Sequence, residues 1–183
     1  MQSDEHADRS LVEQVRAGND AAFEALMKRY KRPVLNFVYR MLSDAGDAED
    51  VAQETFIRAY RRIANYRSQQ NFSTWLFAIA RNAAIDRLRY RQRHPTEPLD
   101  AMPEPAAVSS EVENRETGTQ IAAAIAALPE DQRAALVLAE YHNLSHAEIA
   151  GIMRCSEKAV ESRLYRARQA MRVRLRHWLE LGM

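Results

Sequence analysis

Side chains that can hydrogen-bond to nucleic acid gather on one side of a helix that the sequence predicts near the C-terminus. The polar side carries Lys158, Glu161, Ser162, Tyr165, Arg166 and Gln169. Four apolar residues recur with helical spacing on the opposite side: Val160, Leu164, Ala167 and Met171. Cations bind phosphates, and arginine, serine and carboxylate side chains bond to base edges in the major groove. The pattern favours a DNA-reading helix, and a solvated amphipathic hairpin is the alternative.

A second group of residues with binding chemistry lies between Asn65 and Trp75. Here Tyr66, Phe72 and Trp75 are interleaved with arginine, asparagine and glutamine. Aromatic rings stack on single-stranded bases, each contributing roughly 1–3 kcal/mol, and amides can bond to base edges. The alternative is that Phe72 and Trp75 fill a hydrophobic core. Five arginines follow toward the end of the next predicted helix, a composition typical of phosphate binding: Arg81, Arg87, Arg89, Arg91 and Arg93.

A third candidate surface is the outer side of the helix predicted to begin at Asp47. One side of this helix is apolar and is expected to face the core. The other side carries Asp50, Gln53, Glu54, Ile57 and Arg61. Ile57 is apolar within a polar side, which is a modest sign of a protein-docking patch. Single exposed apolar residues are also common in proteins, so an ordinary solvated surface is the alternative.

Two short predicted helices joined by a tight turn position the first group of residues. Ser145 is placed to cap the first helix, with Glu148 at the capping-box distance. Ser156 can cap the second helix, which carries the polar side described above. This layout is that of a helix-turn-helix, whose second helix enters the major groove of DNA.

The rest of the sequence predicts further helices and no strands, so the expected fold class is all-α. Glycine and proline are few, and no sustained alternation of apolar and polar residues appears. We expect helices over about 11–17, from Asp20 with a kink or break at Pro33, from Asp47 to about Arg62, from Ser73 to about Arg91, over 119–127 and from about Pro129.

Proline content divides the chain into two predicted helical domains. Four of the six prolines fall between His94 and Pro105, which predicts an extended linker. We expect domains at 1–94 and 118–183, joined by a linker at 95–117. Residues 1–94 carry 16 basic and 12 acidic side chains, residues 95–128 carry 1 and 6, and residues 129–183 carry 9 and 7. An acidic spacer thus separates two mildly basic blocks, which predicts weak binding to DNA by the protein alone.

Composition also limits the location and the chemistry of the protein. The single cysteine, Cys155, cannot form an internal disulfide, which suits a reducing cytoplasm. No apolar run approaches the roughly 20 residues needed to span a bilayer, and the N-terminus lacks the features of a signal peptide. A metal-dependent enzyme is a weak alternative, because a predicted helix start separates His142 from His146 and no further ligand completes a site. We therefore expect no catalytic residue, no cofactor and no metal.

Four segments together resemble the extracytoplasmic-function (ECF, group 4) sigma factors of bacterial RNA polymerase, in the sigma-70 family. They are DAEDVAQETFIRAY (47–60), FSTWLFAIARN (72–82), LPEDQR (128–133) and VESRLYRAR (160–168), in the family's order and at similar separations. The resemblance covers nearly the whole chain, including a variable linker. It implies a region 2 domain at 1–94 that binds core polymerase and opens the −10 promoter element. It also implies a region 4 helix-turn-helix at 118–183 that recognises the −35 element.

The resemblance implies roles for individual residues. Contacts to the clamp coiled coil of the polymerase β′ subunit would come from Asp50, Gln53, Glu54 and Ile57, and the β flap would be a further partner. Contacts to the −10 element and its upstream duplex would come from Tyr66, Phe72, Trp75, Asn82, Arg87, Arg89 and Arg91. Contacts to the −35 element would come from Lys158, Glu161, Ser162, Arg163, Tyr165 and Arg166.

The resemblance further implies a regulatory partner and a place in the cell. Members of this family are commonly held inactive by an anti-sigma factor that covers both domains, so we expect such a partner. We also expect a cytoplasmic location, which an anti-sigma factor can restrict to the inner membrane, and control of stress or envelope-response genes. The main alternative function is a stand-alone helix-turn-helix regulator, which would bind specific DNA without polymerase.

Two positions differ from the common family pattern. Many relatives carry glycine at the turn position of Arg154, where a positive φ would strain this residue by about 1 kcal/mol. Glu161 stands where relatives often have lysine or arginine. A carboxylate there can accept a hydrogen bond from a cytosine amino group or can weaken the attraction to phosphate. The −35 preference of relatives therefore does not transfer to this chain.

Overall fold

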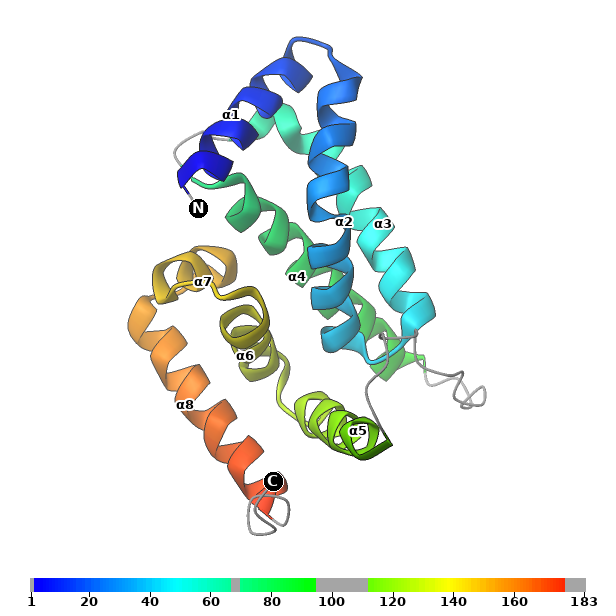
Figure 1. Cartoon of the computed structure of the whole chain (residues 1–183), viewed down its shortest axis with the longest axis vertical. Coiled ribbons are helices and arrows are strands. Elements are labelled where there is room, and N and C mark those ends of the chain that lie inside the picture. Colours follow the sequence, from blue (N-terminus) through cyan, green and yellow to red (C-terminus); the bar gives the residue numbers. More distant parts are fainter. Residues whose placement is uncertain (1, 67–69, 95–111, 177–183) are drawn as a thin grey trace.

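The structure is a computed structural model that describes residues 2–66, 70–94 and 112–176. Within these ranges the chain forms eight α-helices, one 3-10 turn and no strand, which confirms the all-α prediction (Figure 1). The elements are α1 (Gln2–Arg16), α2 (Asp20–Leu42), α3 (Ala45–Arg62), the 3-10 turn η1 (Ile63–Asn65), α4 (Phe72–Arg93), α5 (Val112–Ala126), α6 (Glu130–His142), α7 (His146–Met153) and α8 (Glu157–Arg174).

Helices α1–α4 form the N-terminal domain around a common apolar core. Val12 of α1, Phe37 of α2, Val51 of α3 and Leu76 of α4 are all buried in this core. Helix α2 continues through Pro33 as one helix, so the expected division at this proline is wrong. Helix α4 packs against both α2 and α3, and its position therefore depends on the whole domain.

The helix starts of this domain differ in detail from the sequence prediction. The capping residue of α3 is Asp44 rather than Asp47, because the Asp44 side chain accepts a hydrogen bond from the Asp47 backbone N–H at 2.8 Å. Asp47 lies in the first turn, where its charge favours the helix dipole. Helix α2 begins at Asp20 after Asn19, which makes no side-chain capping bond.

Helices α5–α8 form the C-terminal domain, and α7 and α8 are the predicted helix-turn-helix. Ser145 and Glu148 form the capping box, with the Ser145 N–H donating to Glu148 Oε2 at 2.8 Å and the Glu148 N–H to Ser145 Oγ at 3.3 Å. Ser156 Oγ accepts from the Ala159 N–H at 3.2 Å at the start of α8. Arg154, in the turn, has a φ of +52°, so the left-handed conformation considered for this position is present.

The first helix of the C-terminal domain begins earlier than predicted. Helix α5 starts at Val112, whereas the sequence predicted a helix over 119–127. The segment contains no proline, and its alanine run at 122–124 favours a helix. The prolines of the predicted linker fall within residues 95–111, which lie outside the described part of the chain.

The two domains pack against each other, a feature that the sequence prediction did not contain. Helix α4 contacts α7, and α2 contacts α5 and α6 (Figure 1). The buried Arg133 of α6 spans the junction, because its guanidinium donates to the backbone oxygen of Met41 at the end of α2 and to those of Ala126 and Leu128. These bonds satisfy carbonyl groups near helix ends, where intrahelical partners are missing.

Candidate binding surfaces

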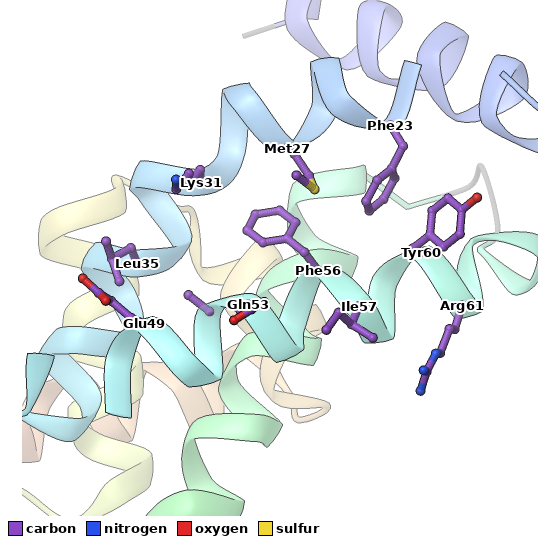
Figure 2. A pocket seen from close by; sticks show the side chains of 11 residues that line it. Phe23, Met27, Lys31, Leu35, Glu49, Gln53, Phe56, Ile57, Tyr60 and Arg61 are labelled. Atoms are coloured by element: carbon purple, nitrogen blue, oxygen red, sulfur yellow. The ribbon is translucent and has the colours of Figure 1, made fainter. Parts of the chain in front are cut away.

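An apolar groove lies between α2 and α3 in the N-terminal domain, and we call it the α2–α3 groove. It has a volume of about 710 Å³ and is lined by Phe23, Met27, Lys31, Leu35, Glu49, Ala52, Gln53, Phe56, Ile57, Tyr60 and Arg61. Figure 2 shows side chains of α2 and α3 meeting along it. Three large apolar or aromatic side chains are exposed here: Ile57 (44 %), Tyr60 (45 %) and Met27 (36 %). These three side chains form a patch over two helices and are not a single exposed apolar residue. Such patches are typical of protein-docking surfaces.

The predicted docking residues of α3 divide between the groove and its edge. Gln53 and Ile57 line the α2–α3 groove. Asp50 and Glu54 are exposed on the same helix outside that lining, where Glu54 accepts from Arg58 at 2.7 Å and Asp50 lies 3.8 Å from Arg87. Helix α2 contributes Phe23 and Met27 to the groove, and the sequence did not predict this because the two residues have the spacing of an ordinary apolar helix side.

The aromatic residues around the 3-10 turn form a packed cluster. The ring centroids of Tyr66, Phe72 and Trp75 lie 5.4–5.9 Å apart. Tyr66 and Phe72 are each 3 % exposed, whereas Trp75 is partly buried. In this conformation the first two rings cannot stack on a base, which agrees with the core alternative for Phe72. Their direct base contact remains untested, and their visible role is to join the turn to the start of α4.

Polar contacts fix the same turn from two sides. Arg16 of α1 donates to the backbone oxygens of Ile63 at 3.2 Å and Ala64 at 3.3 Å, and also to that of Tyr66. Its guanidinium carbon lies 5.9 Å from the centroid of the Tyr66 ring, within cation–π range. The Tyr66 hydroxyl donates to the backbone oxygen of Gln70, on the other side of residues 67–69, which lie outside the described ranges.

The arginines near the end of α4 have two different environments. Arg87 pairs with Asp47 at 2.9 Å, and Arg91 pairs with Asp44 at 3.1 Å and with Asp47. Arg91 also donates to the backbone oxygen of Leu42 at 3.1 Å. Arg89, by contrast, is exposed beside a shallow hollow together with Asp86, Gln92 and Arg93. Asn82 is exposed about two turns closer to the N-terminus of α4. Arg87 and Arg91 thus join α4 to α3, while Arg89 and Asn82 remain accessible.

Five of the six predicted −35 residues lie on the exposed outer side of α8. They are Lys158, Glu161, Ser162, Tyr165 and Arg166, and Tyr165 is 66 % exposed. Glu161 Oε1 lies 3.7 Å from His146 Nδ1, so the carboxylate has a neighbouring donor on α7 when that histidine is protonated. Arg163 differs from these five, because its side chain is partly buried and donates to Asp131 of α6, in the same domain, at 3.2 Å.

His142 lies in an apolar slot between the domains. Its ring centroid is 4.8 Å from that of Phe77 in α4 and 6.0 Å from that of Phe37 in α2. Burial, with a smaller contribution from the nearby charge of Arg40, lowers the pKa of His142 to about 4. His146 is exposed on α7, so the two histidines do not converge. No cluster of three or more His, Cys, Asp or Glu side chains suited to a metal occurs among the described residues.

An all-α chain with a helix-turn-helix in one domain and an apolar docking groove in the other has the architecture of a two-domain transcription factor. The family description "Sigma-70 region 2" matches residues 26–94, and "Sigma-70, region 4" matches residues 119–171. The chain belongs to the ECF group of the sigma-70 family, the RNA polymerase sigma factors. The helix-turn-helix is therefore region 4 of a sigma factor, and a stand-alone regulator is not favoured.

Individual relatives agree with this assignment over almost the whole chain. The RNA polymerase sigma-H factor of Pseudomonas aeruginosa is 38% identical over 181 residues, which cover 90% of this chain and 91% of that protein. The ECF RNA polymerase sigma-E factor of Escherichia coli is 38% identical over 181 residues, 92% of this chain and 94% of the relative. The structure of CnrH in complex with the cytosolic domain of CnrY matches with a TM-score of 0.73 at 25% identity, covering 97% of this chain and 99% of that chain.

Proposed function

We propose that this sigma factor docks on core RNA polymerase through the α2–α3 groove and the adjoining outer side of α3. The exposed apolar group of Met27, Ile57 and Tyr60 is the observation that carries this proposal, since burying it against a partner is favourable. The proposed partner is the clamp coiled coil of the β′ subunit, which the family resemblance implies, and the polar residues Asp50, Gln53 and Glu54 would surround the contact. The β flap would bind the C-terminal domain.

Promoter recognition would then use the accessible side chains of α4 and α8. Trp75, Asn82 and Arg89 are the candidates for the −10 element and its upstream duplex. Tyr66 and Phe72 would support the turn that precedes α4, and Arg87 and Arg91 would contact phosphate while they hold α4 on α3. Contacts to the −35 element would come from the outer side of α8: Lys158, Glu161, Ser162, Tyr165 and Arg166. Arg163 could join them only when its bond to Asp131 of α6 breaks.

The proposed function requires no catalytic residue, because nucleotide addition belongs to the polymerase. The energy for holding the opened strand would come from stacking and pocket contacts on unpaired bases, which offset a few kcal/mol of unpairing. An anti-sigma partner, cytoplasmic action and control of stress or envelope-response genes are proposals that follow from the family resemblance. Among the described residues no helix has the length and hydropathy of a membrane span.

Replacement of Ile57 by Ser tests the docking proposal directly. Ile57 is 44 % exposed, so its loss should remove about 1–2 kcal/mol of burial on binding, a roughly five- to thirtyfold weaker Kd. Val173→Ser is the matched control, because Val173 is an exposed aliphatic residue, 73 % exposed, on α8 and away from the groove. Affinity for core polymerase would be measured by fluorescence anisotropy of labelled sigma factor. Equal affinities of the two variants would contradict docking through the groove.

A further inference from the structure

One acidic side chain lies among the residues that are expected to face DNA. Glu161 is the fifth residue of α8 and the only acid among the five predicted −35 residues on the outer side of this helix. Its side chain is 61 % exposed. In a helix-turn-helix, N-terminal residues of the second helix contact base edges. A carboxylate repels the phosphates on both sides of the groove, so Glu161 weakens binding to DNA unless a hydrogen-bond donor meets it there.

The carboxylate of Glu161 has no lysine or arginine partner among the described residues. Its one ion-pair partner there is His146 of α7, with 3.7 Å between His146 Nδ1 and Glu161 Oε1. Arg168, two turns further along α8, pairs instead with Glu140 of α6 at 2.9 Å. An ionised carboxylate has about four sites that accept hydrogen bonds. Most of the accepting sites of Glu161 therefore remain available to a donor on DNA.

The position of His146 is fixed by the start of α7. His146 is the first residue of this helix, directly after the capping residue Ser145, whose capping box with Glu148 holds the turn. Ile149, one turn further along, is fully buried. The His146 ring and Glu161 line one hollow of about 320 Å³ between α7 and α8. A movement of less than about 1 Å brings Nδ1 within hydrogen-bond distance of Oε1.

The chemistry of a carboxylate favours one base over the other three. Each base presents its own set of donors and acceptors in the major groove. Guanine and thymine present acceptors there, and these oxygen and nitrogen atoms repel a carboxylate. Adenine offers an amino group, but its N7 acceptor lies beside that group and repels the second carboxylate oxygen. Cytosine presents the N4 amino group without an acceptor of its own, so it is the base that suits Glu161 best.

We propose that Glu161 reads a cytosine of the −35 element by accepting a hydrogen bond from its N4 amino group, and that His146 positions the carboxylate for this contact. The proposal rests on the proposed function, which places α8 in the major groove. His146 acts through Glu161, because Nδ1–H donates to one carboxylate oxygen and leaves the other oxygen to the base. A carboxylate held in this way loses less conformational freedom when it binds DNA.

Promoter selection by the reconstituted holoenzyme tests the cytosine contact. Templates randomised over the −35 element would be transcribed, and the sequences that yield transcripts would be counted. At one position the wild-type protein should favour cytosine, on one or the other strand, over guanine and thymine by at least about tenfold. Glu161→Gln should lower the ratio of cytosine to adenine at that position by at least about fivefold, because an amide side chain reads adenine.

Glu157→Gln is the matched control for the loss of charge. Glu157 is an exposed glutamate one turn before Glu161 on the same side of α8, so its replacement removes the same charge from the same surface. Interactions with phosphate carry no sequence information, so the base ranking of Glu157→Gln should stay within about twofold of the wild type.

A second substitution separates base reading from general repulsion. Glu161→Arg should change the preferred base at the same position from cytosine to guanine, since arginine bonds to O6 and N7 of guanine. If Glu161 only repelled phosphate, Glu161→Gln and Glu161→Arg would strengthen binding to every sequence and keep the wild-type base ranking. That result would overturn the cytosine contact.

Two replacements of His146 test its positioning role. His146→Ala removes the donor and should lower the cytosine preference by about three- to fivefold, with other −35 positions within about twofold of the wild type. His146→Asn carries its amide nitrogen on Cγ, as histidine carries Nδ1, and should restore more than about half of the preference. An unchanged cytosine preference in His146→Ala, or no recovery in His146→Asn, would overturn the positioning role.

The wild-type selection distinguishes this proposal from the proposed function. No transcription from any template, or transcription that ignores the −35 sequence, would overturn the proposed function and the cytosine contact together. Transcription that depends on the −35 element, but with no cytosine preference that Glu161→Gln changes, would overturn the cytosine contact alone. A cytosine preference that Glu161→Gln weakens and Glu161→Arg turns toward guanine supports both conclusions.

Discussion

Replacement of Arg154 by Gly should stabilise the protein, because this residue ends α7 in the left-handed region. Its φ is +52° and its ψ is +51°, which places Cβ close to the following carbonyl oxygen. Glycine removes that contact, which raises the free energy of unfolding by about 1–2 kcal/mol. The greater freedom of glycine in the unfolded chain lowers it by about 0.5–1 kcal/mol. The Arg154 side chain makes no hydrogen bond or ion pair within the described residues, so nothing else is lost. The net gain is about 0.5–1 kcal/mol.

Thermal unfolding followed by circular dichroism measures this gain. For a chain of this length a change of 1 kcal/mol shifts Tm by about 2–4 °C, so we expect a rise of about 1–4 °C. Arg32→Gly is the matched control, because Arg32 is an exposed arginine inside α2. Glycine in a helix interior costs about 1 kcal/mol, so the same substitution should there lower Tm by about 2–4 °C.

The direction of the Tm change in Arg154→Gly shows whether Arg154 is strained or has another role. A Tm of Arg154→Gly equal to or below the wild type would refute the reasoning, because the left-handed turn would then cost arginine nothing. The variant should also keep the wild-type preference among −35 sequences, since the turn already has the conformation that glycine adopts. A changed preference would mean that Arg154 contacts DNA.

Two further predictions concern the junction and the reading helix. The free energy of unfolding should fall as the pH is lowered from about 6.5 toward 4, because burial and the charge of Arg40 hold the pKa of His142 at about 4 while the unfolded chain restores its ordinary value of about 6.5, so the unfolded form binds the proton. Thermal unfolding of His142→Gln should lose this part of the pH dependence. Arg166→Ala should cost roughly 1–3 kcal/mol at one −35 position if the guanidinium is bidentate to guanine. Promoter selection with the reconstituted holoenzyme measures this, and an unchanged preference at every −35 position would contradict the assignment.

Local signals made the helix-turn-helix predictable in detail. The capping box of Ser145 and Glu148 and the cap of Ser156 depend on residues within three positions of each other, and the structure contains all of them. The start of α3 was displaced to Asp44 because several acidic residues near this point can act as a cap. Pro33 did not divide α2, since packing of the surrounding apolar residues can outweigh an unfavourable helix residue.

Contacts between distant segments could not be predicted from the periodicity of the sequence. Phe23 and Met27 have the spacing of core residues, and only the position of α3 shows that they line a groove. Tyr66 and Phe72 have the composition of a base-binding loop, yet their rings pack on each other and on Trp75. The domain junction depends on a few side chains of opposite domains, which no pattern within either domain specifies.

The ion pairs between α3 and α4 connect the docking surface to the promoter-reading helix. Asp44, the capping residue of α3, and Asp47, in its first turn, hold Arg87 and Arg91 of α4. The backbone oxygen of Leu42 accepts from Arg91 as well. The Asp47 side chain is 17 % exposed, so this group is sheltered more than ordinary surface pairs are. The same helix, α3, carries Gln53 and Ile57 of the groove. Docking of α3 on a polymerase subunit would therefore fix the direction of α4, and the accessible Asn82 and Arg89 would be brought to the DNA without any rearrangement inside the domain.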